Sequence, residues 1–287
     1  MSSRAWEDIP APVRRAVEKE TGKVSSSVSP SEGRNSDFLA ALQAERGRFF
    51  VKGVRAGTRQ ERMQRIEAKA NPGLPHAVAP RLLWEAEADG WSLLGFEHVA
   101  GRHANLEPGS PDLPLVADAA VTMAQALAGC SLDLPSAAEQ WAWSSPWRRL
   151  SKQPDGKLGL WDRRHLDELV ERERQGIDWV RGDSLVHGDL HPLNILVSDR
   201  ARVVDWAWSS LGAPWLDATS LVLRLVADGH TPAQAEEWAR RIPAYRDAPD
   251  RGITAFSVLV LGMWTYRGAF PQLTEVARRY VRHRLAL

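Results

Sequence analysis

The sequence predicts an α+β fold in which antiparallel strands come first and helices follow. Short apolar runs separated by turn residues occupy much of residues 24–97, whereas apolar stripes with helical spacing dominate after about residue 115. At 287 residues the chain is long enough for one large domain or for two lobes.

The first part of the chain begins with a helix and continues with strands. Residues 6–20 predict an amphipathic helix that begins near a proline and ends at Gly22. The runs 38–44 and 48–54 flank the turn 45–47 and predict an antiparallel hairpin.

A helix and a second pair of strands complete this part. Residues 58–70 predict the helix, and residues 81–84 and 91–96 predict strands on either side of a polar turn. The glycine at 101 then marks a natural boundary.

The second part of the chain is predicted to be mainly helical. Its helical patterns cover residues 115–129, 166–179, 217–226, 232–241, 253–266 and 266–287. Residues 131–160 contain prolines and several tryptophans, and we expect them to be irregular. Short β-branched runs at 195–197 and 202–204 predict a hairpin within this helical part.

The composition limits the classes of function. Lysine and arginine total 37 and aspartate and glutamate total 36, so a net charge of +1 gives no support for nucleic-acid binding or for attachment to a membrane surface. The single cysteine, Cys130, excludes an internal disulfide. The sequence shows neither an apolar run of eighteen residues nor the apolar core of a signal peptide, so we expect a soluble, cytoplasmic protein.

The most informative stretch is residues 185–206, LVHGDLHPLNILVSDRARVVDW. It places Asp189 and Asn194 at the entrance of the predicted hairpin and Asp205 at its exit. Phosphoryl transfer needs such a set, because one carboxylate orients a hydroxyl and two further oxygen ligands hold magnesium. A metal hydrolase that uses His187, Asp189 and His191 is rejected, because Pro192 would break the strand and no other His or Cys cluster exists to complete a site.

The motif HGDLHPLNILV followed by VVDW resembles the aminoglycoside phosphotransferase family, which comprises protein-kinase-like small-molecule kinases. The resemblance implies a bilobal protein-kinase-like fold. Residues 1–97 would form a small lobe with an antiparallel sheet, and residues 98–287 would form a larger, mainly helical lobe. It also implies that the chain is an enzyme that phosphorylates an alcohol group.

In the small lobe the resemblance assigns the residues that hold the nucleotide. Lys52 lies in an apolar strand and would neutralise phosphates, with Glu67 of the next helix as its partner and Glu61 as the alternative. The loop before the first hairpin would cover the phosphates through Arg34 and Ser36, although its single glycine equally fits a solvated turn.

The interlobe hinge would follow the second pair of strands. Backbone groups of Glu97 and Val99 would face the adenine, because a purine edge needs one acceptor and one donor from neighbouring peptide units. The nucleotide implied is ATP, with GTP as the alternative.

In the large lobe the resemblance assigns the chemistry. Asp189 would act as the base that positions the acceptor hydroxyl, and Asn194 and Asp205 would bind Mg²⁺. His187 would hold the loop by hydrogen bonds, and Asp217 would tie the loop from beneath.

The acceptor is left open by the sequence. The resemblance implies a small hydroxyl-bearing molecule, either antibiotic-like, as in antibiotic resistance, or a sugar or amino alcohol. Tryptophans between 131 and 161 fit either substrate stacking or, slightly better, anchoring of a loop. Many relatives carry an acid at the position of Ala207, so an acceptor contact from there is in doubt. The alternative function is a nucleotide-binding pseudokinase or regulatory protein, supported only by the glycine-poor loop. The sequence does not predict the oligomeric state.

Overall fold

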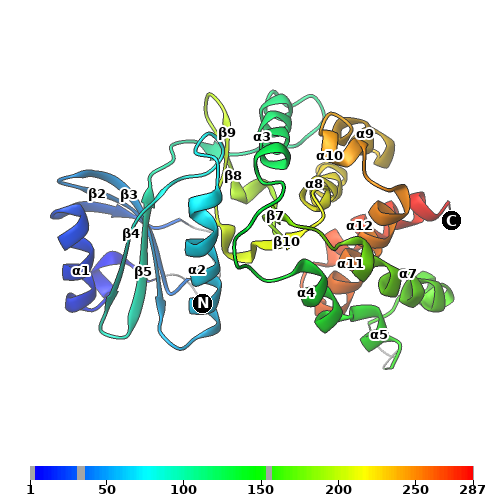
Figure 1. The fold of residues 1–287 in the computed structure, drawn as a ribbon, viewed down its shortest axis with the longest axis horizontal. Helices are drawn as coiled ribbons and strands as arrows, with labels where there is room; N and C mark the ends of the chain where they lie inside the picture. Colours follow the sequence, from blue (N-terminus) through cyan, green and yellow to red (C-terminus); the bar gives the residue numbers. More distant parts are fainter. Residues whose placement is uncertain (1–3, 31–35, 153–156, 287) are drawn as a thin grey trace.

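The computed structural model describes residues 4–30, 36–152 and 157–286. The chain forms a sheet-rich part followed by a helical part, which lie side by side along the long axis of the molecule (Figure 1). We call β1 to β5 with α1 and α2 the N-terminal sheet region, and β6 to α12 the C-terminal helical region. The predicted α+β class, with an antiparallel sheet first and helices after it, is confirmed.

The N-terminal sheet region is built on five antiparallel strands in the order β1-β2-β3-β5-β4. The strands are β1 Val24–Val28, β2 Phe38–Ala44, β3 Gly47–Arg55, β4 Leu82–Ala88 and β5 Trp91–Glu97. Phe38 pairs with Gly53 and Ala44 with Gly47, so the predicted first hairpin is observed with its turn at residues 45–46.

The sheet region also contains two helices that begin and end as sequence signals predict. The helices are α1 Ala11–Thr21, which the 3-10 turn η1 Trp6–Asp8 precedes, and α2 Arg59–Ala70, which the turn η2 Asn71–Gly73 follows. Gly22 ends α1 with a positive φ of 75°. The Thr58 side chain caps α2 by accepting a hydrogen bond from the backbone N–H of Glu61. Figure 1 shows α2 between the sheet and the helical region.

The C-terminal helical region contains most of the helices and two small sheets. The first sheet joins β6 Arg102–His103, β8 Ile195–Val197 and β9 Ala201–Val203, and the second pairs β7 Ser184–Val186 with β10 Ser210–Gly212. The helices are α3 Asp112–Ala126, α4 Ala137–Ser144, α5 Pro146–Leu150, α6 Leu160–Arg164, α7 Leu166–Trp179, α8 Leu216–Ala227, α9 Pro232–Ala239, α10 Pro243–Arg246, α11 Asp250–Arg267 and α12 Pro271–Leu285. The 3-10 turns are η3 Pro192–Asn194 and η4 Trp206–Trp208.

The prediction that residues 131–160 are irregular is wrong, because this segment contains α4 and α5. Ser136 caps α4 by accepting the N–H of Glu139, and Ser145 in a left-handed conformation separates α4 from α5. Pro146 then stands in the first turn of α5, where a missing N–H costs no hydrogen bond. Pro146 therefore marks the start of a helix and does not indicate irregular structure.

The two regions have separate hydrophobic cores. Trp6, Val17 and Phe38 belong to the core of the sheet region, whereas the largest core belongs to the helical region. Val78 and Ala79, which lie between α2 and β4, pack into the core of the helical region. The predicted boundary between residues 97 and 98 stays a prediction. No helix in the part of the chain that the structure describes is long and apolar enough to cross a membrane.

Candidate active site

Lys52 connects the two regions through its ammonium group. It lies in the middle of β3, and its Nζ donates to both carboxylate oxygens of Glu67, each at 2.8 Å. It also lies 2.6 Å from Oδ1 of Asp205. The predicted pairing with Glu67 is confirmed. Glu61 is not the partner, because its carboxylate binds the N–H of Gly57 and the guanidinium of Arg65.

The charges of this cluster depend on one another. Burial by itself would lower the pKa of Lys52, but the carboxylates of Asp205 and Glu67 hold that pKa above its usual value. Burial raises the pKa of Glu67. For Asp205 the opposing effect of burial is outweighed by the Lys52 ammonium, which lowers the pKa of the carboxyl. Lys52 is therefore an ammonium ion at neutral pH, and Asp205 is a carboxylate.

Asp205 is held by an unusual backbone conformation and by α2. Its φ of 65° and ψ of 62° lie in the left-handed region, which aspartate tolerates better than most residues. The N–H of Trp206 donates to Oε1 of Glu67 at 3.1 Å. Glu67 consequently fixes both the phosphate-binding lysine expected from the sequence and the chain that follows Asp205.

His187 holds the catalytic loop in place. The N–H of Asp189 donates to Nδ1 of His187, so Nδ1 is an acceptor and Nε2 carries the proton that bonds to the carbonyl of Val204 at 3.0 Å. The imidazole is fully buried and packs edge-on against Trp206 at 4.8 Å between ring centroids. Since both ring nitrogens are engaged, His187 is not placed to accept a proton from a substrate.

Asp217, at the start of α8, supports the same loop from below. Its two oxygens accept the N–H groups of His187 at 2.7 Å and of Gly188 at 3.1 Å. Burial raises the pKa of this carboxyl.

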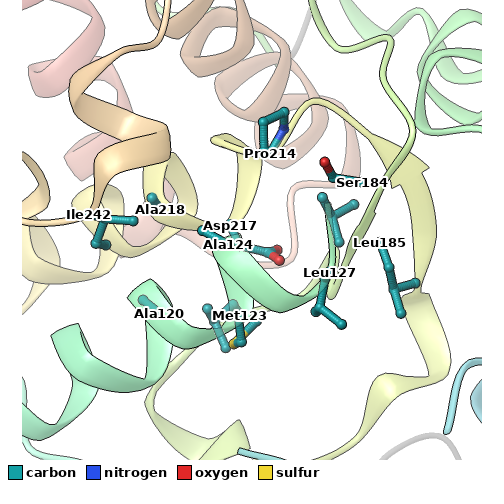
Figure 2. Close-up of a pocket in the computed structure, with 12 residues that line it drawn as sticks. Ala120, Met123, Ala124, Leu127, Ser184, Leu185, Pro214, Asp217, Ala218 and Ile242 are labelled. Atoms are coloured by element: carbon teal, nitrogen blue, oxygen red, sulfur yellow. The ribbon is translucent and has the colours of Figure 1, made fainter. Parts of the chain in front are cut away.

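Figure 2 shows Asp217 beside the apolar side chains of α3 and α8, which line a cavity of about 20 Å³. The cavity has room for about one water molecule, so it is not a substrate site.

Asp189 and Asn194 face each other across the loop. The Asn194 side-chain N–H donates to the carbonyl of Asp189 at 3.0 Å, which leaves the amide oxygen of Asn194 for another partner. The Asp189 side chain is 39% exposed, and its Oδ2 lies 3.7 Å from Nε2 of His191. Burial lowers the pKa of His191 despite the opposing charge of Asp189, so His191 is a neutral neighbour.

The oxygen donors near the loop suit magnesium. The amide oxygen of Asn194, which makes no hydrogen bond to any described residue, and the ionised carboxylate of Asp205 are hard ligands of the kind that Mg²⁺ prefers. Among the described residues no group of three His, Cys, Asp or Glu side chains is arranged to hold a metal ion.

The predicted hinge lies between β5 and β6. The carboxylate of Glu97 is engaged by the protein, because it contacts Nε2 of His76 at 2.8 Å, the N–H of Arg81 and a guanidinium nitrogen of Arg202. The backbone N–H of Glu97 is also engaged, because it donates to the carbonyl of Arg81 at 2.9 Å. The expected contact of Glu97 with adenine would therefore have to use its carbonyl, and the contact stays a prediction. Val99 follows in the coil and is partly buried.

The predicted phosphate loop is described only in part. Ser36 lies in coil shortly before β2 and is partly exposed. Arg34 lies outside the described residues.

Two arginines near the site were not predicted. Arg202 of β9 contacts Glu97, and Arg224 of α8 lies over the ring of Trp264 at 5.1 Å from its centroid. The only sequence signal for Arg202 is a charge inside a short β-branched strand. Arg224 follows Asp217 by seven residues, which places both on one helix face.

The tryptophans of residues 141–161 mostly anchor the chain. Trp147 is fully buried and donates from Nε1 to the carbonyl of Val258, and Trp141 packs edge-on against Phe256. Trp143 differs, because it is 79% exposed. The anchoring interpretation therefore holds for Trp147 and Trp141.

A family model matches most of the chain. Residues 30–252 match the phosphotransferase enzyme family. No curated protein sequence matches the chain significantly.

Solved structures resemble the fold over nearly the whole chain. An aminoglycoside phosphotransferase in a ternary complex with ADP and hygromycin B has a TM-score of 0.65 at 13% identity, covering 96% of this chain and 99% of that one. The GDP complex of an aminoglycoside 2′-phosphotransferase gives 0.67 at 16%, with 96% and 97% covered. A choline kinase from Streptococcus pneumoniae gives 0.62 at 14%, with 96% and 98% covered.

Proposed function

This chain belongs to the phosphotransferase enzyme family, and we propose that it transfers the γ-phosphate of ATP, with GTP as the alternative donor, to a hydroxyl group of a small molecule. The observation that carries the proposal is the buried Lys52, bound to Glu67 and Asp205 beside the loop that presents Asp189. A lysine ammonium held in this way is a fixed positive charge for phosphate oxygens.

Each residue of the site has a separate part in the proposed reaction. Lys52, oriented by Glu67, binds phosphate oxygens and reduces their negative charge. Asp189 accepts a hydrogen bond from the acceptor hydroxyl and takes its proton as the oxygen attacks the γ-phosphorus. The bond from that phosphorus to the β–γ bridging oxygen breaks, and the nucleoside diphosphate leaves with its electron pair. His187 and Asp217 keep the loop in the geometry that this step needs.

Asn194 and Asp205 are the proposed magnesium ligands. When bound, Mg²⁺ would reduce the charge of the β- and γ-phosphates. Asp205 lies 2.6 Å from Nζ of Lys52, so its carboxylate is charged and stands beside the ammonium group that is proposed to bind phosphate.

The surroundings of α8 support a polar acceptor with both hydroxyl and amino groups. Burial and the negative charge of Glu107 raise the pKa of Asp228, which caps the C-terminal end of α8. Arg224 lies on the same helix and is influenced by the charges of Asp189 and Asp228. A site with both signs of charge fits a sugar or amino-alcohol acceptor better than a dense polycation. Hygromycin B is bound by one structural neighbour and another is a choline kinase, so antibiotic-like acceptors belong in the test.

The test compares the wild-type protein with Asp189→Asn. We expect wild type to release ADP from ATP and Mg²⁺ in the presence of one compound from a panel of aminoglycosides, hygromycin B, choline, sugars and amino alcohols. Asp189→Asn should lower this turnover by about 10²–10⁴-fold, because the general base is lost. Its affinity for magnesium and ADP should stay close to that of wild type.

Two outcomes would count against this assignment. Full turnover by Asp189→Asn would show that Asp189 is not the base. Binding of nucleotide by wild type without turnover on any compound would favour the pseudokinase alternative. Asp199→Asn, in the exposed turn of the β8–β9 hairpin, is the matched control and should behave as wild type.

We propose a cytoplasmic location, which the single cysteine supports.

A further inference from the structure

The β8–β9 hairpin carries a proposed magnesium ligand at each end. Asn194 immediately precedes β8, and Asp205 follows β9 by two residues. The N–H of Val204 donates to the carbonyl of Asn194 at 2.9 Å, so the two ends of the hairpin are bonded to each other. A movement of the hairpin therefore moves both ligands together.

The middle of this hairpin is attached to the hinge. Nη1 of Arg202 lies 3.2 Å from Oε1 of Glu97, and Nη2 donates to the carbonyl of Ala79 at 2.9 Å. Beside it the N–H of Val203 donates to the carbonyl of Val78 at 2.6 Å. The other carboxylate oxygen of Glu97 is held by His76 and the N–H of Arg81.

The arginine side of this attachment is buried, and its burial costs free energy. The Arg202 side chain is only 13% exposed, and its Nε is a buried donor that has no partner within the described parts of the chain. An unpaired buried donor costs about 1–3 kcal/mol. Burial alone would raise the pKa of Glu97, but His76 and Arg202 hold that pKa below its usual value. Glu97 is thus ionised, so one of its oxygens can pair with Arg202 and the other with His76 and the N–H of Arg81.

We propose that Arg202 is a positioning residue that couples the hinge to the magnesium ligands. This inference rests on the proposed function, in which the hinge backbone at Glu97 binds the base and the hairpin ends bind magnesium. Because one guanidinium joins both parts, a base seated at the hinge fixes the hairpin, and magnesium at the hairpin fixes the hinge. Nucleotide base and magnesium should consequently bind with positive coupling.

The test measures the dissociation constant of ADP by calorimetry, with and without Mg²⁺, on the full chain. The variants are Arg202→Met, Glu97→Gln and the double variant. Arg200→Met is the control, since Arg200 lies in the same hairpin and pairs only with its neighbour Asp199 among the described residues. The factor by which Mg²⁺ tightens ADP binding should fall about tenfold in Arg202→Met. Glu97→Gln should show a similar fall, the double variant no further fall, and Arg200→Met none.

The outcomes separate this inference from the proposed function. If wild type binds ADP neither with nor without Mg²⁺, the proposed function fails. If wild type responds to Mg²⁺ and Arg202→Met responds equally, or loses affinity equally in both conditions, only the coupling is refuted. Should Arg202→Met fail to fold, Arg202→Lys replaces it, because lysine keeps a charge for Glu97 and cannot also reach Ala79 with a planar fork. Arg202→Lys must then also reduce the factor by which Mg²⁺ tightens ADP binding. A factor equal to that of wild type would refute the coupling.

Discussion

At the scale of single residues, burial and charge shift the pKa values of two aspartates of the site in opposite directions. The lysine beside Asp205 outweighs the effect of burial and lowers the pKa of Asp205. Asp217 has backbone N–H groups as its hydrogen-bond partners, and burial raises the pKa of its carboxyl. The first residue is suited to bind a cation, whereas the second is suited to hold a loop.

We expect Asp217→Asn to be destabilising although it is nearly isosteric. An asparagine amide can accept one of the N–H groups of His187 and Gly188, but its own NH₂ group then opposes the other. The bond from the exposed Gly188 is the cheaper one to lose, so the free energy of unfolding should fall by about 0.5–1.5 kcal/mol, the net contribution of one hydrogen bond. Urea unfolding measures the change, and Asp199→Asn is the exposed control; equal stability of the two variants contradicts the role given to Asp217.

The sign of the pH dependence follows from the raised pKa of Asp217. A carboxyl with a raised pKa in the folded state favours folding fully below its unfolded pKa of about 3.9, and this contribution is lost as the pH rises through the folded value. The stability of wild type relative to Asp217→Asn should therefore increase as the pH is lowered from about 7 to about 4. A decrease over this range would mean that the folded carboxyl has a lowered pKa.

At the scale of elements, the β4–β5 pair depends on one glycine. Trp84 lies opposite Gly95, and a Cβ added at Gly95 would overlap the indole of Trp84. Gly95→Ala should lower the free energy of unfolding by about 1–3 kcal/mol, because a rigid ring must move out of the way. Unfolding in urea checks this. Gly159→Ala is the control, since its Cβ would make an ordinary contact at 3.4 Å, and a similar loss there would refute the explanation.

Most elements could be predicted because their signals are local. Gly22 ends α1, and Thr58 caps α2. The choice of Glu67 over Glu61 rested on the helix face that Glu67 shares with Met63 and on a distance to residues 79–80 that suits the family. The prediction failed for α4 and α5, where Pro146 and several tryptophans mimic an irregular segment. The signal that identifies these helices is the capping serine at 136, and a capping residue is easily missed in a segment rich in prolines.

At the scale of the whole molecule, a buried ion pair attaches the last helix to the middle of the chain. Arg278 of α12 donates from Nε and Nη2 to the two oxygens of Asp162, which is fully buried in α6. Among the residues that the structure describes, Arg278→Met would leave Asp162 with only the N–H of Gly159, and breaking such a pair costs about 3–5 kcal/mol. Arg282→Met, on an exposed position of the same helix, should change stability by less than about 0.5 kcal/mol. Denaturant titration of both variants tests the difference, and comparable losses would contradict it.

The contacts that complete the site could not be predicted from sequence. Lys52 and Asp205 are 153 positions apart, and Glu97 and Arg202 are 105 apart. No period or turn signal links such distant residues, because their approach depends on how the two regions pack. The resemblance to a family supplied Lys52, Glu67, Asp189, Asn194 and Asp205 as a set. It supplied nothing for Arg202, whose role is visible only in the folded chain.

The burial of Val78 and Ala79 in the core of the helical region has a consequence for engineering. A natural way to alter nucleotide preference would be to graft the first 97 residues of a relative onto this chain. Such a graft would replace Val78 and Ala79 with residues shaped for a foreign core, and it would exchange the segment whose carbonyl at Val78 accepts the N–H of Val203. A workable exchange needs two splice points, one after α2 and one before β4, so that residues 71–80 remain with the recipient.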